Sequence, residues 1–120
     1  TMPNTPALLG AGVTGLYATP ATTLSQKALA DALLKPAGET VWIADEALMD
    51  AVTAASGSGP AYVFLLAEAM QAAAEAEGLP ADAARTLVVE TIAGAARMLK
   101  ESGESATTLR QRVTSPNGTT

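Results

Sequence analysis

The run Ala61–Ala67 constrains the fold more than any other part of the sequence, because it is apolar around its whole circumference when wound as a helix. Such a helix has no face to offer to water, so we expect it to be buried on every side. The chain has 120 residues, and Ala dominates the 48% of residues that are apolar. Small side chains bury little area, and a chain of this size gains from sharing its core with a partner. The sequence therefore predicts an oligomer in which the helix running from Ala61 to Gly78 is covered largely by another subunit.

The first third of the chain predicts a mixed α/β arrangement. Gly12–Thr19 is expected to be a short extended segment, and Glu39–Ile43 a second strand. Between them, Thr23 followed by Gln26 forms a capping box, which predicts a helix that Lys35 and Pro36 end. Thr1–Pro6 is expected to be a loop because prolines bracket it.

From Asp45 onward the pattern is helical. Asp45 is a suitable N-cap for a helix over Glu46–Ala55, and a long amphipathic helix is expected between Pro80 and Gly103. Its apolar side comprises Ala84, Leu87, Val88, Ile92, Ala95, Met98 and Leu99. A short helix over Ala106–Val113, capped by Ser105, completes a fold that we expect to be mainly α.

Composition excludes several classes of function. The net charge is −5 with no basic stripe, which argues against nucleic acid as a partner. Cys and His are absent, so no metal site built on those residues is expected, and the lack of Cys fits a reducing cytoplasm. Residues 1–26 carry no charged side chain, but their prolines and glycines interrupt any membrane span. The acidic residues Glu68, Glu75 and Glu77 on one helix are expected to form a solvated stripe.

Two segments contain residues suited to binding a ligand, and each also has a purely structural interpretation. Ser56–Pro60 (Ser-Gly-Ser-Gly-Pro) resembles a phosphate-binding loop, but a helix precedes it and Pro60 removes a donor. A corner between two helices with close backbone packing is the favoured interpretation. Thr114–Thr120 places four hydroxyls around a Pro-Asn-Gly turn. It is either an ordinary helix cap or the start of a carboxylate-binding site at a helix N-terminus.

Three stretches together resemble the pyrroline-5-carboxylate reductase family. They are Met2-Pro3-Asn4-Thr5-Pro6, Ser56-Gly57-Ser58-Gly59-Pro60-Ala61-Tyr62 and Val113-Thr114-Ser115-Pro116-Asn117-Gly118-Thr119-Thr120. The resemblance implies that residues 1–44 are the last β/α elements of a Rossmann-type dinucleotide-binding domain. It implies that residues 45–120 are a helical dimerisation and substrate-binding domain that is not complete in this sequence. The homo-oligomer would be a homodimer or larger.

The resemblance also implies an activity and its residues. The reaction would be the NADPH- or NADH-dependent reduction of 1-pyrroline-5-carboxylate, a small imino acid, to L-proline in the cytoplasm. Thr120 would be catalytic, its hydroxyl bonded to the ring nitrogen. The substrate carboxylate would be held by a loop that comprises Ser115, Asn117, Gly118, Thr119 and Thr120. The wall near the nicotinamide would include Met2, Pro3 and Asn4.

The sequence departs from the family pattern in three respects. Asn117-Gly118 stands where the family usually has Gly-Gly, and Ser105-Ala106 where a His-Pro pair is common. The sequence also has no Gly-x-Gly-x-x-Gly and lacks both the Rossmann core and a final helix, so we expect it to be a piece of a longer enzyme. The alternative is a helical dimerisation module that catalyses nothing, and the mass of the material would discriminate between the two.

Overall fold

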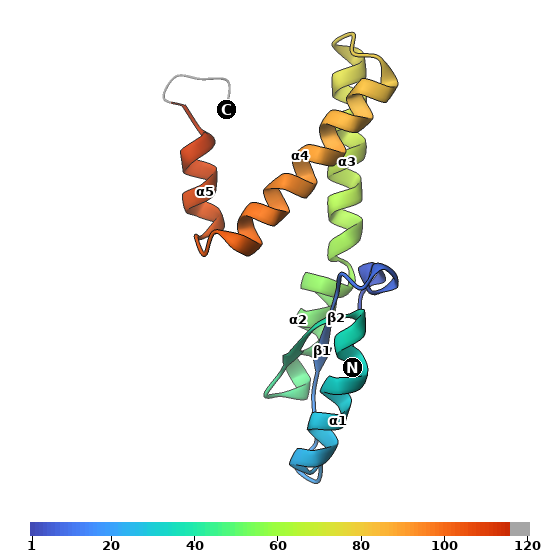
Figure 1. The fold of residues 1–120 in the computed structure, drawn as a ribbon, viewed down its shortest axis with the longest axis vertical. Helices are drawn as coiled ribbons and strands as arrows, with labels where there is room; N and C mark the ends of the chain where they lie inside the picture. Colours follow the sequence, from blue (N-terminus) through green and yellow to red (C-terminus); the bar gives the residue numbers. More distant parts are fainter. Residues whose placement is uncertain (116–120) are drawn as a thin grey trace. The chain divides into compact units, whose positions relative to one another are not determined.

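A computed structural model describes residues 1–115. It is mainly helical with one small sheet, as the sequence predicts (Figure 1). The chain divides into two compact units, Thr1–Leu65 and Leu66–Thr120, and the boundary falls within the helix α3 (Gly59–Ala76).

The first unit is built on a β-α-β arrangement. Strands β1 (Gly12–Leu16) and β2 (Gly38–Trp42) are parallel, with Gly12 opposite Gly38 and Leu16 opposite Trp42. Helix α1 (Leu24–Leu34) connects them, and a 3₁₀ turn, η2 (Lys35–Ala37), leads into β2. Parallel neighbours need such a crossover, so the helix between the two strands follows from their pairing.

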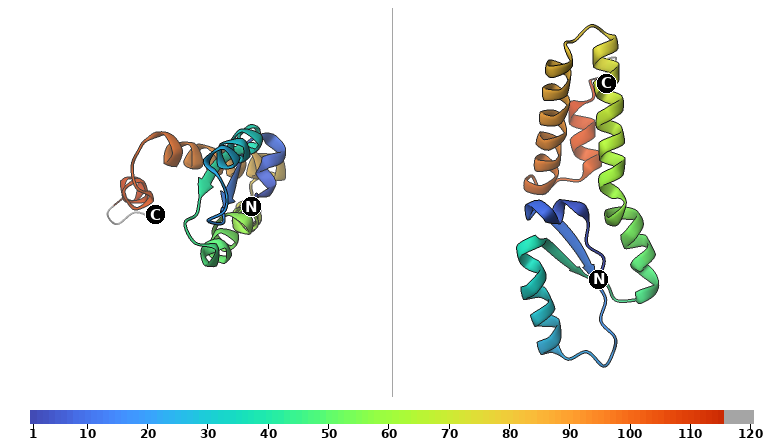
Figure 2. Two further views of the ribbon diagram at one scale, coloured as in Figure 1. Left: turned by 90° about the horizontal axis from the view of Figure 1, so that it is seen from below. Right: turned by 90° about the vertical axis from the view of Figure 1, so that its right-hand side faces the viewer.

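The start of α1 is set by local sequence. The predicted capping box is present, since Thr23 accepts from the backbone N–H of Gln26 and the Gln26 side chain accepts from the backbone N–H of Thr23. The sheet lies between α1 and the short helix α2 (Met49–Val52), which cover opposite faces (Figures 1 and 2). Within this sheet Leu16 is 1% exposed and forms the centre of the unit's core.

The segment after β2 differs from the single helix predicted over Glu46–Ala55. Asp45 accepts from the backbone N–H of Ala47, as a cap should, but it begins a 3₁₀ turn, η3 (Glu46–Leu48), which α2 follows. The chain then widens into a π-helical turn, η4 (Thr53–Gly57), before α3. Pro60 has no N–H to donate to the carbonyl four residues earlier, which accounts for the interruption before α3, but it does not account for the 3₁₀ turn at the start of the segment.

The second unit consists of the remainder of α3, α4 (Ala81–Glu101) and α5 (Ala106–Val113). Helices α3 and α4 form an antiparallel hairpin, and the connection turns at Gly78, which has a φ of 96° (Figure 2). Helix α5 has the predicted bounds and the predicted cap, with Ser105 accepting from the backbone N–H of Thr108 at 3.1 Å.

The buried core of the second unit is small in a single chain. Among the described residues of this unit only Ala84 and Val88, one helical turn apart on α4, are buried hydrophobics. Other members of the predicted apolar side of α4 remain exposed, including Leu87 (56%) and Met98 (53%). The predicted amphipathic helix is therefore present, but its apolar side is only partly covered within the chain.

The apolar run Ala61–Ala67 in α3 is not buried all round in the single chain. Its five consecutive residues Tyr62, Val63, Phe64, Leu65 and Leu66 are each at least 43% exposed. The expectation of complete burial therefore fails for one chain alone, because too few side chains surround the helix. Burial by a second subunit stays a prediction.

Candidate functional site

Met2 extends the sheet on the side of β1 that β2 does not occupy. Its N–H donates to the carbonyl of Gly15 at 2.8 Å, and its carbonyl accepts from the N–H of Gly15 at 3.0 Å, which makes an antiparallel bridge. Pro3 follows and is exposed. The segment predicted to form a cofactor wall is thus attached to the edge of the strand at the centre of the first unit.

The side chain of Asn4 continues this attachment. Its Oδ1 accepts from the backbone N–H of Val13 at 3.0 Å. The backbone carbonyl of Asn4 is used elsewhere, since it accepts from the N–H of Ala7 at 3.1 Å and so begins the 3₁₀ turn η1 (Thr5–Leu9). Residues 1–6, expected to be a loop, therefore include a bridge and the first turn of a 3₁₀ helix.

The Ser56–Pro60 segment lies beside this attachment. A Cβ added at Gly57 would sit 3.5 Å from the sulfur of Met2, so Gly57 and Met2 are neighbours although more than fifty positions separate them. Close packing also occurs between β1 and α2, where a Cβ at Gly15 would come within 2.5 Å of Val52 Cγ1. Two of the three stretches that carry the family resemblance therefore meet at the edge of β1.

The same segment is not arranged as a phosphate cradle. The N–H of Ser58 donates to the carbonyl of Thr53 at 2.8 Å, and the hydroxyl of Ser56 donates to the carbonyl of Val52 at 3.0 Å. These groups satisfy the π-helical turn and do not project toward a ligand. The corner between two helices, which the sequence favours, is the arrangement that the structure shows.

The third stretch begins where α5 ends, in the second unit. The hydroxyl of Thr114 donates to the carbonyl of Arg110 at 2.8 Å, and the backbone of Thr114 is extended, so the helix stops here. Ser115 follows and is exposed. The other predicted substrate-binding residues, Asn117, Gly118, Thr119 and Thr120, lie outside the described residues, and the structure does not test their role.

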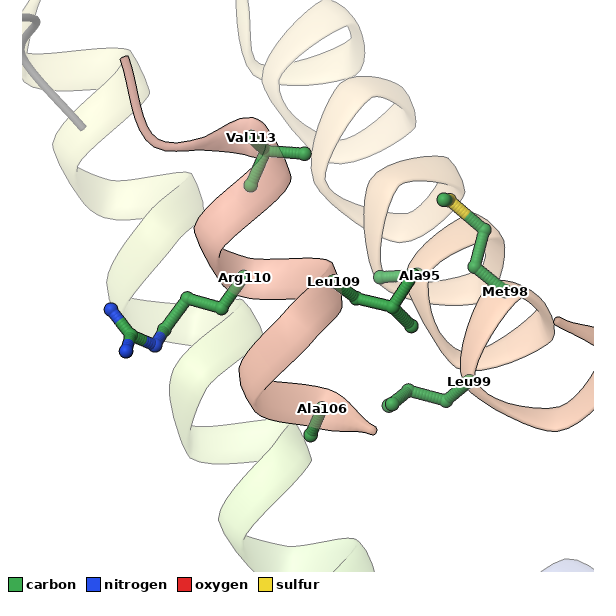
Figure 3. A pocket seen from close by; sticks show the side chains of 7 residues that line it. All are labelled: Ala95, Met98, Leu99, Ala106, Leu109, Arg110 and Val113. Carbon is green, nitrogen blue, oxygen red and sulfur yellow. The ribbon is translucent and has the colours of Figure 1, made fainter. Parts of the chain in front are cut away.

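An apolar groove of about 230 Å³ lies between α4 and α5, and the sequence reasoning did not identify it. It is lined by Ala95, Met98, Leu99, Ala106, Leu109, Arg110 and Val113. Leu109 and Val113 point from α5 toward α4, whereas the guanidinium of Arg110 extends away from the groove (Figure 3). The exposed apolar side of α4 was the available signal, and the groove shows that α5 covers part of it only loosely.

One electrostatic perturbation in the described part of the chain lies in the first unit, at Asp31. The indole N–H of Trp42 donates to Asp31 Oδ2 at 3.0 Å and lowers the pKa of that carboxyl, and Thr40 and Lys35 act in the same direction. The ammonium nitrogen of Lys27 also lies over the ring of Trp42, 5.5 Å from the ring centroid. These contacts fasten α1 to β2, and nothing about them points to catalysis.

Two classes of site are missing from residues 1–115. No group of three or more acidic, Cys or His side chains is arranged to hold a metal ion. No helix in this range is long and apolar enough to span a membrane. The carboxylates of Glu68, Glu75 and Glu77 are on exposed residues, as a solvated stripe requires.

Comparison with known proteins gives consistent matches along the chain. Residues 46–120 match the family model described as pyrroline-5-carboxylate reductase dimerisation. The chain is 52% identical over 119 residues to pyrroline-5-carboxylate reductase from Pseudomonas aeruginosa, covering 99% of this chain and 44% of that protein. It is 50% identical over 120 residues to the Haemophilus influenzae enzyme, with the same coverage. The chain thus spans less than half the length of these curated relatives.

Solved structures give the same result. A pyrroline-5-carboxylate reductase from Coxiella burnetii superposes with a TM-score of 0.93 at 47% identity, covering 98% of this chain and 44% of that one. A Plasmodium falciparum pyrroline carboxylate reductase solved with NADP bound superposes with a TM-score of 0.88 at 34% identity, covering 98% of this chain and 48% of that one.

Proposed function

We propose, since the chain belongs to the pyrroline-5-carboxylate reductase family, that it is part of a longer enzyme that reduces 1-pyrroline-5-carboxylate to L-proline with NADPH or NADH. The observation that carries this proposal is the match over 99% of the chain to an enzyme of that name at 52% identity. The protein would act in the cytoplasm, as its composition without Cys allows.

Residues 1–44 are proposed to be the end of the dinucleotide-binding domain. The parallel pairing of β1 with β2 through α1 supports this, since such β-α-β units build Rossmann-type sheets. Residues 45–120 are proposed to be the helical dimerisation and substrate-binding domain. The start of this second region belongs to the first compact unit, as the neighbouring positions of Val52 and Gly15 illustrate. The proposed domain boundary after residue 44 and the boundary between the compact units after Leu65 therefore differ.

Met2, Pro3 and Asn4 are proposed to form part of the wall near the nicotinamide. Their attachment to β1 gives them a fixed position, which a cofactor contact requires. The nicotinamide supplies the hydride when it is bound, and the protein supplies binding and orientation. Residues 1–26 carry no charged side chain, so this segment suits an uncharged ring with its carboxamide better than it suits phosphates.

The substrate carboxylate is proposed to bind hydroxyl and backbone N–H groups of Ser115, Asn117, Gly118, Thr119 and Thr120. The Thr120 hydroxyl would contact the ring nitrogen, where the charge changes as hydride reaches the neighbouring carbon. The end of α5 at Val113 and the extended backbone of Thr114 support this arrangement, because they let a loop begin here.

The enzyme is proposed to be a homodimer or larger homo-oligomer in which α3 lies at the subunit interface. Tyr62, Phe64 and Leu65 are 60%, 65% and 65% exposed in the single chain.

The experiment that tests this function uses the full-length protein, which means this sequence together with the remainder that its relatives carry. Purified protein is mixed with 1-pyrroline-5-carboxylate and NADPH or NADH, and cofactor oxidation and proline formation are followed together. One proline formed for each cofactor oxidised supports the proposal. A protein that is folded and binds the cofactor but forms no proline would refute it.

A further inference from the structure

Asn4 lies where the antiparallel pairing of Met2 with β1 would continue in a regular strand. Met2 pairs with Gly15 in antiparallel register, so two steps further along each segment place Asn4 opposite Val13. In a regular antiparallel ladder the N–H of Val13 would donate to the backbone carbonyl of Asn4. The carbonyl of Asn4 instead accepts from the N–H of Ala7, which starts η1.

The Asn4 side chain substitutes for that missing carbonyl. Its Oδ1 accepts from the Val13 N–H at 3.0 Å, which is an ordinary hydrogen-bond length. A backbone N–H can only donate, so this contact identifies the oxygen of the carboxamide without ambiguity. The plane of the carboxamide is thereby restrained, and so are the directions of its two N–H bonds.

The amide nitrogen of Asn4, in contrast to the oxygen, makes no hydrogen bond within the described residues. Within residues 1–115 no group accepts from its Nδ2, although the residue is half-buried and its oxygen accepts from the N–H of Val13. A carboxamide whose oxygen alone serves the fold holds two oriented donors in the segment that Met2 attaches to β1. The surrounding segment is uncharged, so the acceptor that suits these donors is a neutral oxygen.

We infer that Asn4 donates through Nδ2 to the carboxamide oxygen of the nicotinamide, while its Oδ1 holds the segment on β1. This inference rests on the proposed function, and it divides one side chain into a structural half and a binding half. Fixing the carboxamide of the ring would orient the ring face that delivers hydride. Asn4 is thus a specificity residue for the nicotinamide half of the cofactor.

The two halves of Asn4 can be separated by substitution in the full-length protein. Asn4→Asp keeps an oxygen acceptor for Val13 and loses both donors, whereas Asn4→Ala loses acceptor and donors together. Gln26→Glu is a matched control, since its Oε1 accepts from the Thr23 N–H at 2.8 Å and the change likewise converts an amide into a carboxylate. The probes are NADPH or NADH and ADP-ribose or its 2′-phosphate, which lack only the nicotinamide. Affinities are measured by calorimetry and stability by thermal unfolding.

Asn4→Asp is expected to unfold at the temperature of the wild type and to bind the intact cofactor about tenfold more weakly, as loss of one well-placed hydrogen bond would produce. Its affinity for ADP-ribose should be unchanged, and Gln26→Glu should match the wild type throughout. Asn4→Ala should lose both thermal stability and cofactor affinity.

Two results would overturn the inference. In one, Asn4→Asp binds the intact cofactor as tightly as the wild type does. In the other, it loses affinity equally for ADP-ribose, which would show that its charge repels the phosphates.

A measurement on the wild type guards against a variant that fails to fold. The thionicotinamide analogue of the cofactor replaces the carboxamide oxygen with sulfur, a weaker acceptor. It is expected to bind several-fold more weakly than the natural cofactor, and equal binding would contradict the assignment. Failure of the proposed function has a different signature, because the wild type would then form no proline from 1-pyrroline-5-carboxylate with any cofactor.

Discussion

Gly15 lies at a position where the packing leaves no room for a larger side chain. A Cβ added there would lie 2.5 Å from Val52 Cγ1, whereas carbon atoms in contact prefer about 3.5–4.0 Å. Overpacking of this kind costs about 1–3 kcal/mol, and the lower chain entropy of Ala in the unfolded state offsets up to about 1 kcal/mol of that. Gly15→Ala in the full-length protein should therefore lose about 1–2 kcal/mol, which corresponds to a fall in Tm of about 2–8 °C.

The clash can be relieved from the opposite side. Val52→Ala removes Cγ1 and leaves Cβ, which would lie 3.5 Å from the new methyl group in an ordinary contact. The single change should cost about 1 kcal/mol, and adding Gly15→Ala to it should cost nothing further. Gly57→Ala is the control, since its Cβ would meet no atom closer than 3.5 Å and its Tm should not fall. Thermal unfolding of all four variants checks the cycle. Additive losses in the double variant would show that Val52 and Gly15 do not pack as described.

Other predictions concern the interface, the substrate loop and one carboxyl group. Leu65→Asp should convert the dimer to an unstable monomer in light scattering, because an unpaired charge would be buried, and a stable dimer would contradict the placement of α3. Thr120→Val should lower kcat about a hundredfold, as loss of one preorganised donor does, while Ser115→Ala should mainly raise KM, and unchanged kinetics in both would reduce them to helix caps. Trp42→Phe should raise the pKa of Asp31 toward its ordinary 3.8 in an NMR titration, and an unmoved pKa would exclude the indole as the main cause.

The Asp31 contact also has a defined pH dependence. Because its pKa is lowered in the folded state, the contribution of Asp31 to stability is fully present above 3.8 and is lost as the pH falls through the lower, folded value. The stability difference between the wild type and Trp42→Phe should therefore shrink below pH 3.8.

Local signals in the sequence predicted the start of α1, the start of α5 and the end of α4 well. Thr23 with Gln26, Ser105 before the last described helix and Gly103 after the long one all act within a few residues. Gly103 has a φ of 71°, a conformation that Gly adopts at little cost. These features need no tertiary context, so pattern and composition are sufficient to locate them.

Contacts between distant residues were beyond the same reasoning. The bridge between Met2 and Gly15, and the neighbouring positions of Met2 and Gly57, depend on how the chain folds back on itself. The use of the Asn4 oxygen by Val13 was not predicted either, because it arises only once the Asn4 carbonyl is committed to η1. The sequence named Met2 and Asn4 by resemblance, and the structure supplies a physical reason for Asn at position 4, whose side-chain oxygen accepts from Val13.

The π-helical turn illustrates a partial success. The glycines and Pro60 indicated an interruption between two helices, and an interruption is present. Its form depends on the hydroxyls of Thr53 and Ser56, which donate to carbonyls four residues earlier. Such bonds bend helices to an extent that sequence alone does not specify.

Isotope tracing tests most directly whether the enzyme transfers hydride from the nicotinamide to the imine carbon of 1-pyrroline-5-carboxylate. The full-length protein is incubated with 1-pyrroline-5-carboxylate and a reduced cofactor that carries deuterium at both hydride positions of the nicotinamide. Proline with one deuterium, located at Cδ, is expected for each cofactor oxidised. Proline without deuterium, or oxidation of the cofactor without proline, would contradict it.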